Sequence, residues 1–576
     1  MPNNTMKIVF QASAKDFEKI PGAPIVYWLP PILKQLFASQ PNVNDFIKLR
    51  EGIHTSDNAL FLRFWPEVSF FKFSFLCSSI QDIDNRKAKW IPYNKGGSWR
   101  KWFGNNELVI SFDTTSREKM ANSPTHVRPS QDLYFKSGAT WSALSNGHFC
   151  LRYYPDGYLF DSKGQVAVGV NSSMVMALFN TNAYQVMASA IMPTLDYKCG
   201  DVKKLPYAHI VNDVFLQNAM KCVEISKQDW DSYEASWDFT FNLLIKRHIN
   251  SLFKSFSIIR QHWTEMTEEM HRLEEENNRI FIEAYGLQDE LSPDVPWNEI
   301  TLTCNPWYRY GATPQNPTCK EFPVDVALEA RLKADTMKEF LSYAVGCMFG
   351  RYSLDKPGLV LANQGETLAD YLKQIPQPTF MPDEDNVLPI LDEDWFADDI
   401  VTRFNEFLKT TFGEENFYEN LAFIEEALGK DVRSYFLKDF YKDHLQRYHN
   451  HPIYWLFSSP KEAFNALVYM HRYRPETVGI VLTYLRSHIT KVTERIHTLE
   501  TTIDSSDSTA GMKSKAIRER SRLQKSLREL EDYERDVLYP LATEKIAIDL
   551  DDGVKVNYRK FGDALYKIKG LEAKEE

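Results

Sequence analysis

"WIPYNKGGSWRKWFGN", residues 90–105, is the stretch from which the fold class can be read. A Gly-Gly pair separates two runs rich in aromatic residues, and the apolar run ELVISF follows at 107–112. Similar short runs continue through about 46–210, among them FLRFWPEVSFFKFSFL, FCLRYY, GYLFD and QVAVGV. Short apolar runs that are separated by Gly, Asn, Ser and Pro turns are typical of β-strands. We therefore expect a β-rich domain over 46–210.

The remainder of the chain has a helical pattern. Apolar side chains recur every three or four residues in one long segment, namely at Leu252, Phe256, Ile259, Trp263, Met266, Met270 and Leu273. This stripe predicts an amphipathic helix, and we expect it to pack within the chain rather than form a dimeric coiled coil. A second stripe comprises Ile489, Val492, Ile496, Leu499 and Ile503. The polar break DSSDSTAG (504–511) and a further helical run follow it, which predicts an antiparallel helical hairpin.

These patterns predict an α+β protein with four parts. Residues 1–45 are expected to be a remnant that links to a domain outside this chain, and 46–210 to be the β-rich domain, with a helix at 172–192 packed on its sheet. Residues 211–325 are expected to form a helical spacer with a Pro-containing loop. Residues 326–576 are expected to form an all-α region that includes the helical hairpin.

Composition limits the class of protein. The 576-residue chain has a formal net charge of −11 and a pI near 5.7, which argues against a uniformly basic nucleic-acid binder but allows a local basic face. Seven scattered cysteines without a CxxC pair indicate reduced thiols, not a disulfide framework or a zinc site. No apolar run reaches about 18 residues, and the start MPNNTMKIVF lacks a signal-peptide core. We expect a cytoplasmic protein without membrane contact.

A search for catalytic motifs finds none that carries an activity. The sequence contains no GxxxxGK[ST], GxSxG or HExxH. His449 and His451 are close together but lack partners at metal-ligand spacing, and surface positions are favoured for them. The acidic run within 382–399 is interpreted as a solvated loop or a protein-contact surface. NPWY at 305–308 resembles the Asn-Pro-Pro-Tyr motif of amino-methyltransferases, but Trp307 replaces the second proline, so we interpret it as a decoy.

The basic aromatic loop is the strongest local signal for a ligand. Six basic residues and no acidic one lie between 86 and 104, and the two glycines allow close backbone approach. Basic side chains neutralise phosphates, and aromatic ones stack or insert between bases. The alternative is an exposed hairpin whose tryptophans only pack on the sheet. REGIHTSDNALFLRFW (50–65) supplies short polar side chains that suit phosphates and base edges. The predicted DNA-facing set is Asn94, Lys95, Arg100, Lys101, Gly52, Thr55, Ser56 and Asn58.

Six segments resemble one known family, in the same order along the chain. They are LREGIHTSDNALFLRFW, WIPYNKGGSWRKWFGNNELVI, MPTLDYKCGDVKKLP, NRIFIEAYGLQDEL, YAVGCMFGRYSLDKPGL and HPIYWLFSSPKEAFNALVYMHRY. They are similar to segments of the PglX-type adenine-specific DNA methyltransferases of BREX phage-defence systems, which are akin to type IIG restriction–modification enzymes. The resemblance covers residues from about 15 to about 490.

The resemblance implies an architecture of a methyltransferase domain, a β-rich target-recognition domain and a helical C-terminal part. This chain resembles the second and third pieces. Gly52–Phe61 is similar to the Gly-x-x-Thr-Gly-x-x-x-x-Phe element that opens such recognition domains, with Ser56 in place of the second glycine. MPTLDYKCGDVKKLP is similar to the closing element, near residue 206. The catalytic motif and the S-adenosylmethionine site are expected upstream, so we expect no catalytic, cofactor-binding or metal-binding residue here and no activity of this chain alone.

Two functions follow as hypotheses. The first is the DNA-recognition and C-terminal portion of an adenine-N6 DNA methyltransferase, with duplex DNA as partner and S-adenosylmethionine as cofactor of the complete enzyme. The second is a protein-interaction module, in which the acidic segment 382–399 and the helical C-terminus dock other BREX components or a separately encoded catalytic half.

Overall fold

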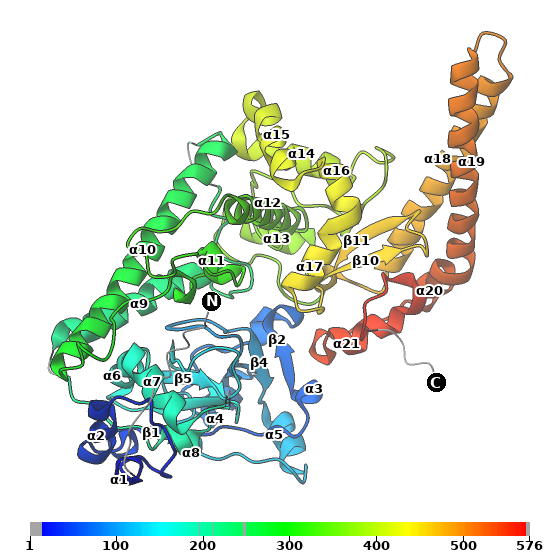
Figure 1. Cartoon of the computed structure of the whole chain (residues 1–576). Coiled ribbons are helices and arrows are strands. Elements are labelled where there is room, and N and C mark those ends of the chain that lie inside the picture. The colour runs from blue at the N-terminus through cyan, green and yellow to red at the C-terminus, as the bar shows by residue number, and fades with distance from the viewer. Residues whose placement is uncertain (1–13, 195, 211, 246–248, 572–576) are drawn as a thin grey trace. The chain divides into compact units, whose positions relative to one another are not determined.

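The protein is described by a computed structural model that covers residues 14–194, 196–210, 212–245 and 249–571 (Figure 1). These residues form two compact units. Unit 1 comprises the described residues up to Arg63, Lys72–Asp231 and Arg260–Glu329. Unit 2 comprises Phe64–Phe71, Ser232–Ile259 and the described residues from Ala330 onwards. Both units contain helices and strands, which confirms the predicted α+β class.

Unit 1 is built around two four-stranded sheets. The first sheet has the order β1 (Lys48–Arg50), β8 (Gly164–Val168), β5 (Gly138–Ser142), β6 (Arg152–Tyr154), and all its pairs are antiparallel. The second has the order β2 (Leu62–Phe64), β4 (Leu108–Ser111), β3 (Trp90–Asn94), β7 (Leu159–Phe160). In this sheet β3 pairs antiparallel with β4 and parallel with β7. The predicted β-rich texture of this region thus corresponds to short strands whose residues are almost all buried.

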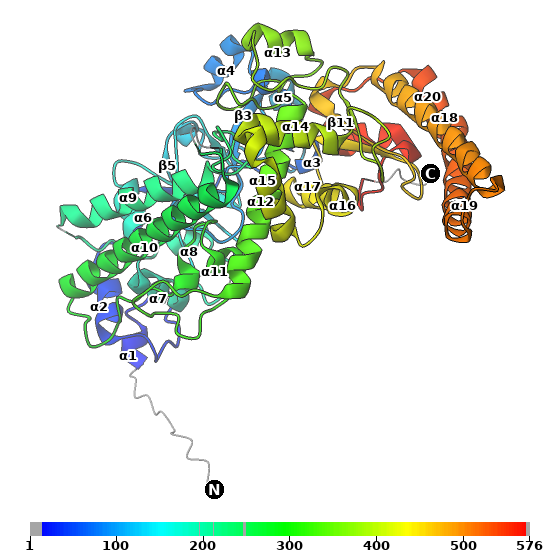
Figure 2. The same ribbon diagram turned by 90° about the horizontal axis from the view of Figure 1, so that it is seen from above.

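Helices complete unit 1. The predicted helix at 172–192 is two helices, α6 (Ser172–Phe179) and α7 (Asn182–Ile191). Asn180 breaks it, because its side chain bonds the backbone N–H and C=O of Leu151 at 2.8 and 3.0 Å and thereby ties the chain to β6. The other helices are α1 (Ala14–Phe17), α2 (Pro31–Ser39), α3 (Asn58–Phe61), α4 (Ile80–Arg86), α5 (Thr114–Ala121), α8 (Cys199–Val202), α9 (Asp213–Trp230), most of α10 (Leu252–Ala284) and α11 (Pro306–Arg309). Figure 2 shows α9 and α10 next to one another.

The boundaries of unit 1 differ from the predicted parts. Residues 1–13 of the predicted remnant lie outside the described residues, and 14–45 pack within unit 1. The backbone N–H of Val43 donates to Leu205 at 2.9 Å, which joins this segment to the end of the β-rich region. The predicted spacer is not separate either, because α9 and most of α10 belong to the same unit. Most of the apolar stripe of α10 is buried, as expected for packing within the chain, with Met270 of unit 1 only 1% exposed.

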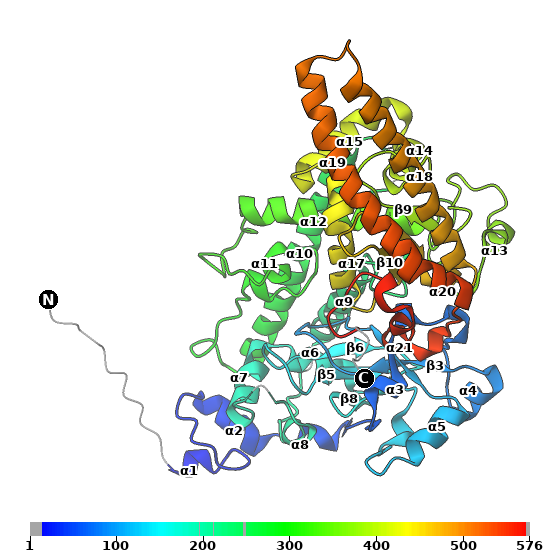
Figure 3. The same cartoon turned by 90° about the vertical axis from the view of Figure 1, so that its right-hand side faces the viewer.

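Unit 2 is mainly helical but contains a sheet that we did not predict. Its helices are most of α12 (Val326–Met348), α13 (Leu368–Gln374), α14 (Ile400–Phe412), α15 (Phe417–Leu428), α16 (Val432–Tyr435), α17 (Tyr441–Arg447), α18 (Thr477–Asp504), α19 (Ala510–Tyr533), α20 (Tyr539–Glu544) and α21 (Val554–Asn557). The antiparallel sheet has the order β10 (Tyr454–Ser458), β11 (Asn465–Tyr469), β9 (Val387–Pro389). The prediction of an all-α C-terminal region was therefore wrong. The predicted hairpin is confirmed by α18 and α19, which run side by side (Figure 3).

Candidate nucleic-acid interface

The basic aromatic loop that connects β3 to β4 folds into unit 1. Trp102 is 1% exposed and donates from Nε1 to Oε1 of Glu274 on α10 at 2.6 Å. Its backbone N–H donates to Leu151 at 3.0 Å, beside β6. Gly104 permits this path, because its φ is +124° and an added Cβ would lie 2.7 Å from Cδ of Arg100. The loop therefore joins the β-structure to the helices of unit 1, which favours a structural role for its tryptophans.

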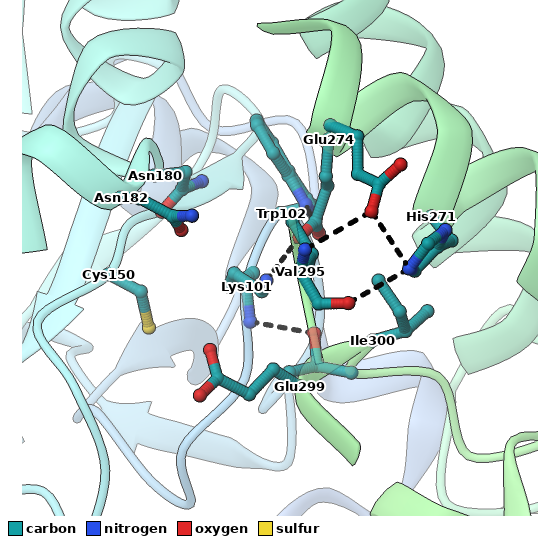
Figure 4. A network of polar contacts seen from close by, with 12 residues as sticks. Lys101, Trp102, Cys150, Asn180, Asn182, His271, Glu274, Val295, Glu299 and Ile300 are labelled. Carbon is teal, nitrogen blue, oxygen red and sulfur yellow. Dashed lines mark hydrogen bonds and ion pairs between the residues drawn. The ribbon is translucent and has the colours of Figure 1, made fainter. Parts of the chain in front are cut away.

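Lys101 lies in the interior, although we predicted that it faces DNA. Its ammonium group forms an ion pair with Glu274, and the two side chains are 1% and 3% exposed. Figure 4 shows Lys101 and Trp102 converging on Glu274. Burial by itself lowers the pKa of Lys101, but the negative charges of Glu274 and Glu299 raise it above its ordinary value. Lys101 is therefore charged, and its charge neutralises a carboxylate of this chain.

Arg100 is buried in the same way. Its guanidinium contacts the carboxylate of Asp229 at 3.3 Å, with the two side chains 4% and 1% exposed. The guanidinium also lies 5.2 Å from the centre of the Trp230 ring, within the range of a cation–π contact. Asp229 additionally accepts a hydrogen bond from the backbone N–H of Cys304 at 2.9 Å. Arg100 thus connects the loop to the end of α9 and to the segment before α11.

Four of the eight predicted DNA-facing residues therefore have a buried side chain, and Gly52 is buried as well. Besides Arg100 and Lys101, they are Asn94, which is 6% exposed at the end of β3, and Thr55, which is 3% exposed. The partners of the two basic residues are 129 and 173 positions away in the sequence. A window in which basic residues have no acidic neighbour says nothing about such distant carboxylates. The loop is locally basic, as the sequence indicates, but the positive charges of Arg100 and Lys101 are neutralised by Asp229 and Glu274 inside unit 1.

Of the predicted set, Lys95 and Asn58 carry the polar groups that reach the surface, whereas the hydroxyl of Ser56 is buried. Nζ of Lys95 lies 3.2 Å from Oδ2 of Asp161, and the Lys95 side chain is 29% exposed. The hydroxyl of Tyr93 donates to the same carboxylate at 2.9 Å and contacts the carbonyl of Ile53 at 3.2 Å. Asp161 and Tyr93 thereby bring Lys95 close to the 52–58 segment. We call residues 52–58 together with Lys95 the recognition corner.

The conformation of the recognition corner explains its glycine and serine. A Cβ at Gly52 would lie 1.9 Å from the carbonyl oxygen of Phe160, so no larger residue fits without moving β7. Ser56 has a φ of +71°, a left-handed conformation that glycine adopts most easily. The resembled element has glycine at this position, and the structure shows the backbone geometry that favours it. Thr55 donates from its hydroxyl to Oδ1 of Asn58 at 2.7 Å, which holds the turn before α3.

No protein-family model matches the sequence. The chain is 37% identical to the adenine-specific methyltransferase BrxX of Escherichia coli O9:H4 (strain HS), over 99% of its own length and 47% of that protein. It is 36% identical to the adenine-specific methyltransferase PglX of Lacticaseibacillus casei (strain Zhang), over 97% of its own length and 46% of that protein. The chain is a relative of these adenine-specific methyltransferases.

The chain spans about half the length of the curated relatives that it matches. The similarity supports the PglX-type resemblance found in the sequence. The comparisons do not support the narrower expectation of a C-terminal portion without a catalytic domain, which stays a prediction. Among the helices that the structure describes, none is long and apolar enough to cross a membrane.

In this methyltransferase relative, the NPWY segment has a structural role. Asn305 is fully buried, and its side-chain amide donates to the carbonyls of Trp297 and Ile300 at 2.8 and 2.9 Å. Its Oδ1 accepts from the backbone N–H of Trp307 at 3.2 Å and so caps α11. A polar side chain engaged in three local bonds is not placed to bind a target amino group. The geometry agrees with the interpretation of NPWY as a decoy.

The acidic segment 382–399 is less solvated than we predicted. Asp399 is fully buried, caps α14 through Thr402 at 2.8 Å and forms an ion pair with Arg433 at 2.8 Å. Burial and the charge of Asp385 raise the pKa of Asp383 to about 7. Exposed members of the segment also have partners within unit 2, as Asp392 pairs with Arg522. Much of this acidic charge therefore stabilises the chain itself.

The described residues contain no group of three or more His, Cys, Asp or Glu side chains that could hold a metal ion.

Proposed function

We propose that this chain is the DNA-recognition and C-terminal portion of an S-adenosylmethionine-dependent adenine-N6 DNA methyltransferase of a BREX-type phage-defence system. The observation that carries the proposal is the similarity over 97–99% of the chain to two proteins named adenine-specific methyltransferases. Unit 1 contributes recognition of the target duplex. One adenine would then leave the stack and enter the pocket of the catalytic domain, because methyl transfer to a base requires access to its amino group.

The recognition corner is the part of unit 1 that we assign to DNA. Lys95 supplies a partly exposed positive charge and Asn58 an exposed amide, whereas Thr55 and Ser56 act through the turn that presents Asn58. Such side chains contact phosphates and position a protein on the duplex. Gly52 contributes through the backbone packing that fixes the turn. Arg100 and Lys101 act indirectly in this proposal, because they hold the loop that follows Lys95.

Binding of duplex DNA to the whole chain tests the proposal, with Lys95→Gln as the variant. We expect weaker binding and a salt dependence whose slope falls by about 0.9, the value of one lost phosphate contact. The variant retains the fold, because Asp161 keeps its hydrogen bonds from Tyr93 at 2.9 Å and from the backbone of Lys163 at 2.7 Å. Lys204→Gln is the matched control, since Lys204 is a paired lysine of the same unit, 2.7 Å from Asp201.

Equal weakening by both variants would contradict the assignment of the recognition corner, and absence of duplex binding at low salt would contradict the function. The cofactor is tested separately by calorimetry with S-adenosylmethionine. We expect no binding by this chain alone, since the cofactor site is assigned to a catalytic domain outside it.

Docking of other BREX components or of a separate catalytic half remains a prediction. The internal pairing of Asp399 with Arg433 and of Asp392 with Arg522 reduces the charge that the acidic segment offers to a partner. Co-purification with a methyltransferase-domain protein is the measurement that supports this version.

A further inference from the structure

Unit 2 contains a cleft of about 670 Å³ beside the α18–α19 hairpin. Its walls come from the two hairpin helices, from the turn between β10 and β11, and from the segment 391–395. This volume lies within the range of small-molecule sites. Part of the lining is apolar, with contributions from Leu391, Trp395, Leu437, Val492 and Leu523. The cleft therefore has space and apolar surface for a compact organic ligand.

Positive side chains border the cleft. Arg518, Arg522 and Lys525 line it from α19, at spacings of four and three residues that place them on one face of the helix. Lys461 lines it from the β10–β11 turn. Arg522 pairs with Asp392, whereas Arg518, Lys525 and Lys461 form no ion pair with any described residue. Three cations thus remain available to an anionic ligand.

The acidic residues of the cleft do not cancel this charge. Oε1 of Glu529 accepts hydrogen bonds from the hydroxyl of Ser459 at 2.6 Å and the backbone N–H of Lys461 at 2.8 Å. These bonds use the carboxylate to fasten the β10–β11 turn to α19. The carboxylate of Asp392 is engaged by Arg522. Glu462 is the remaining acidic residue of the lining, so the unpaired cations outnumber it.

A buried polar atom also lines the cleft. His488 of α18 is 3% exposed, and its Nδ1 has no hydrogen-bond partner among the described residues. Burial lowers the pKa of His488 to about 4, against the opposing effect of the Asp392 charge. The imidazole is therefore neutral at pH 7. Burying a polar atom without a partner destabilises the protein, and a polar group of a ligand would satisfy Nδ1 of His488.

We propose that the cleft binds a nucleoside phosphate. Arg518, Lys525 and Lys461 would hold the phosphate, and the sugar and base would lie against the apolar lining that includes Trp395. The three cations suit the negative charge of a phosphate. The apolar walls suit a base, and Nδ1 of His488 can bond a polar group of the base or sugar. The ligand is either a free nucleotide or a nucleotide unit of single-stranded DNA. This site is independent of DNA recognition by unit 1.

Binding of ATP and of a dT12 oligonucleotide to the whole chain, each followed by Trp fluorescence and calorimetry, tests the proposal. The variant is Arg518→Gln with Lys525→Gln, at two exposed side chains that make no ion pair with described residues. We expect at least a tenfold loss of affinity for the probe that binds. The matched control is Lys515→Gln with Arg528→Gln, which removes the same charge from exposed positions of α19 that do not line the cleft. This control is expected to change affinity less than twofold.

Each probe distinguishes a source of the ligand. Variant-sensitive binding of ATP but not of dT12 identifies a free nucleotide, and the reverse identifies a strand of DNA. The proposal is overturned if neither probe binds, or if the control pair weakens binding as much as the cleft pair. It is also overturned if inorganic pyrophosphate competes as strongly as ATP, because the apolar walls would then contribute nothing. The duplex assay with Lys95→Gln is unaffected by any of these outcomes.

Discussion

Replacing Lys101 by Met is the sharpest perturbation of the loop between β3 and β4. Methionine retains most of the apolar stem but removes the charge that neutralises Glu274. The two side chains are 1% and 3% exposed, so Glu274 would remain as an uncompensated buried carboxylate. Breaking a buried pair by removing one partner costs about 3–5 kcal/mol. Glu274 keeps the hydrogen bond from Trp102 at 2.6 Å, and we therefore expect the lower end, about 3 kcal/mol.

Urea unfolding followed by Trp fluorescence measures this loss. The double variant Lys101→Met with Glu274→Leu removes both charges and should recover most of the stability, because an apolar pair of similar volume often replaces a buried ion pair at little cost. Lys95→Gln is the control for a lysine with a partly exposed side chain, and we expect a change below about 1 kcal/mol. The reasoning is refuted if Lys101→Met leaves the free energy of unfolding unchanged and abolishes duplex binding, since Lys101 would then contact DNA.

Three further predictions concern other positions. Burial and the charge of Asp385 raise the pKa of Asp383 to about 7. Between about pH 4 and 7 the folded protein therefore keeps a proton that the unfolded chain has released, so its stability falls as pH rises through this window. Asp383→Asn should flatten this slope in unfolding curves measured at pH 4–8. Gly52→Ala should destabilise unit 1 by about 3 kcal/mol or more, because the added Cβ would lie 1.9 Å from the carbonyl oxygen of Phe160; a variant with the parental thermal midpoint would contradict this close approach. Ser56→Gly should stabilise by about 0.5–1 kcal/mol, because the φ of Ser56 is +71°, and calorimetry that shows a loss of stability would contradict that reason.

Periodicity and turn residues were sufficient to predict the secondary structure of several parts of the chain. The three-and-four spacing at Val492, Ile496 and Leu499 predicted α18, since these residues are the buried stripe of that helix. The C-terminal sheet was missed, although YWLFS (454–458) and NALVY (465–469) are strand-like runs on either side of a turn. Helical patterns on both sides concealed them.

The candidate site was less predictable than the fold. The sequence neighbours of Lys95 and Lys101 do not distinguish the two lysines, yet Lys95 is partly exposed and Lys101 is buried against Glu274 of α10. Which lysine reaches the surface depends on carboxylates 66 and 173 positions away. A single sequence contains no local sign of such partners. Gly52 was assigned to DNA for the same reason, whereas its contact is with the backbone of Phe160.

Photo-crosslinking of the whole chain to a duplex that carries iodinated pyrimidines, followed by mass spectrometry, tests the central claim most directly. We predict cross-linked peptides from unit 1 that contain the recognition corner, at salt concentrations where binding is observed. Cross-links to Arg100 or Lys101 are not expected, because both side chains are paired in the interior. Cross-links confined to unit 2, or none under binding conditions, would contradict the account of DNA recognition by this chain.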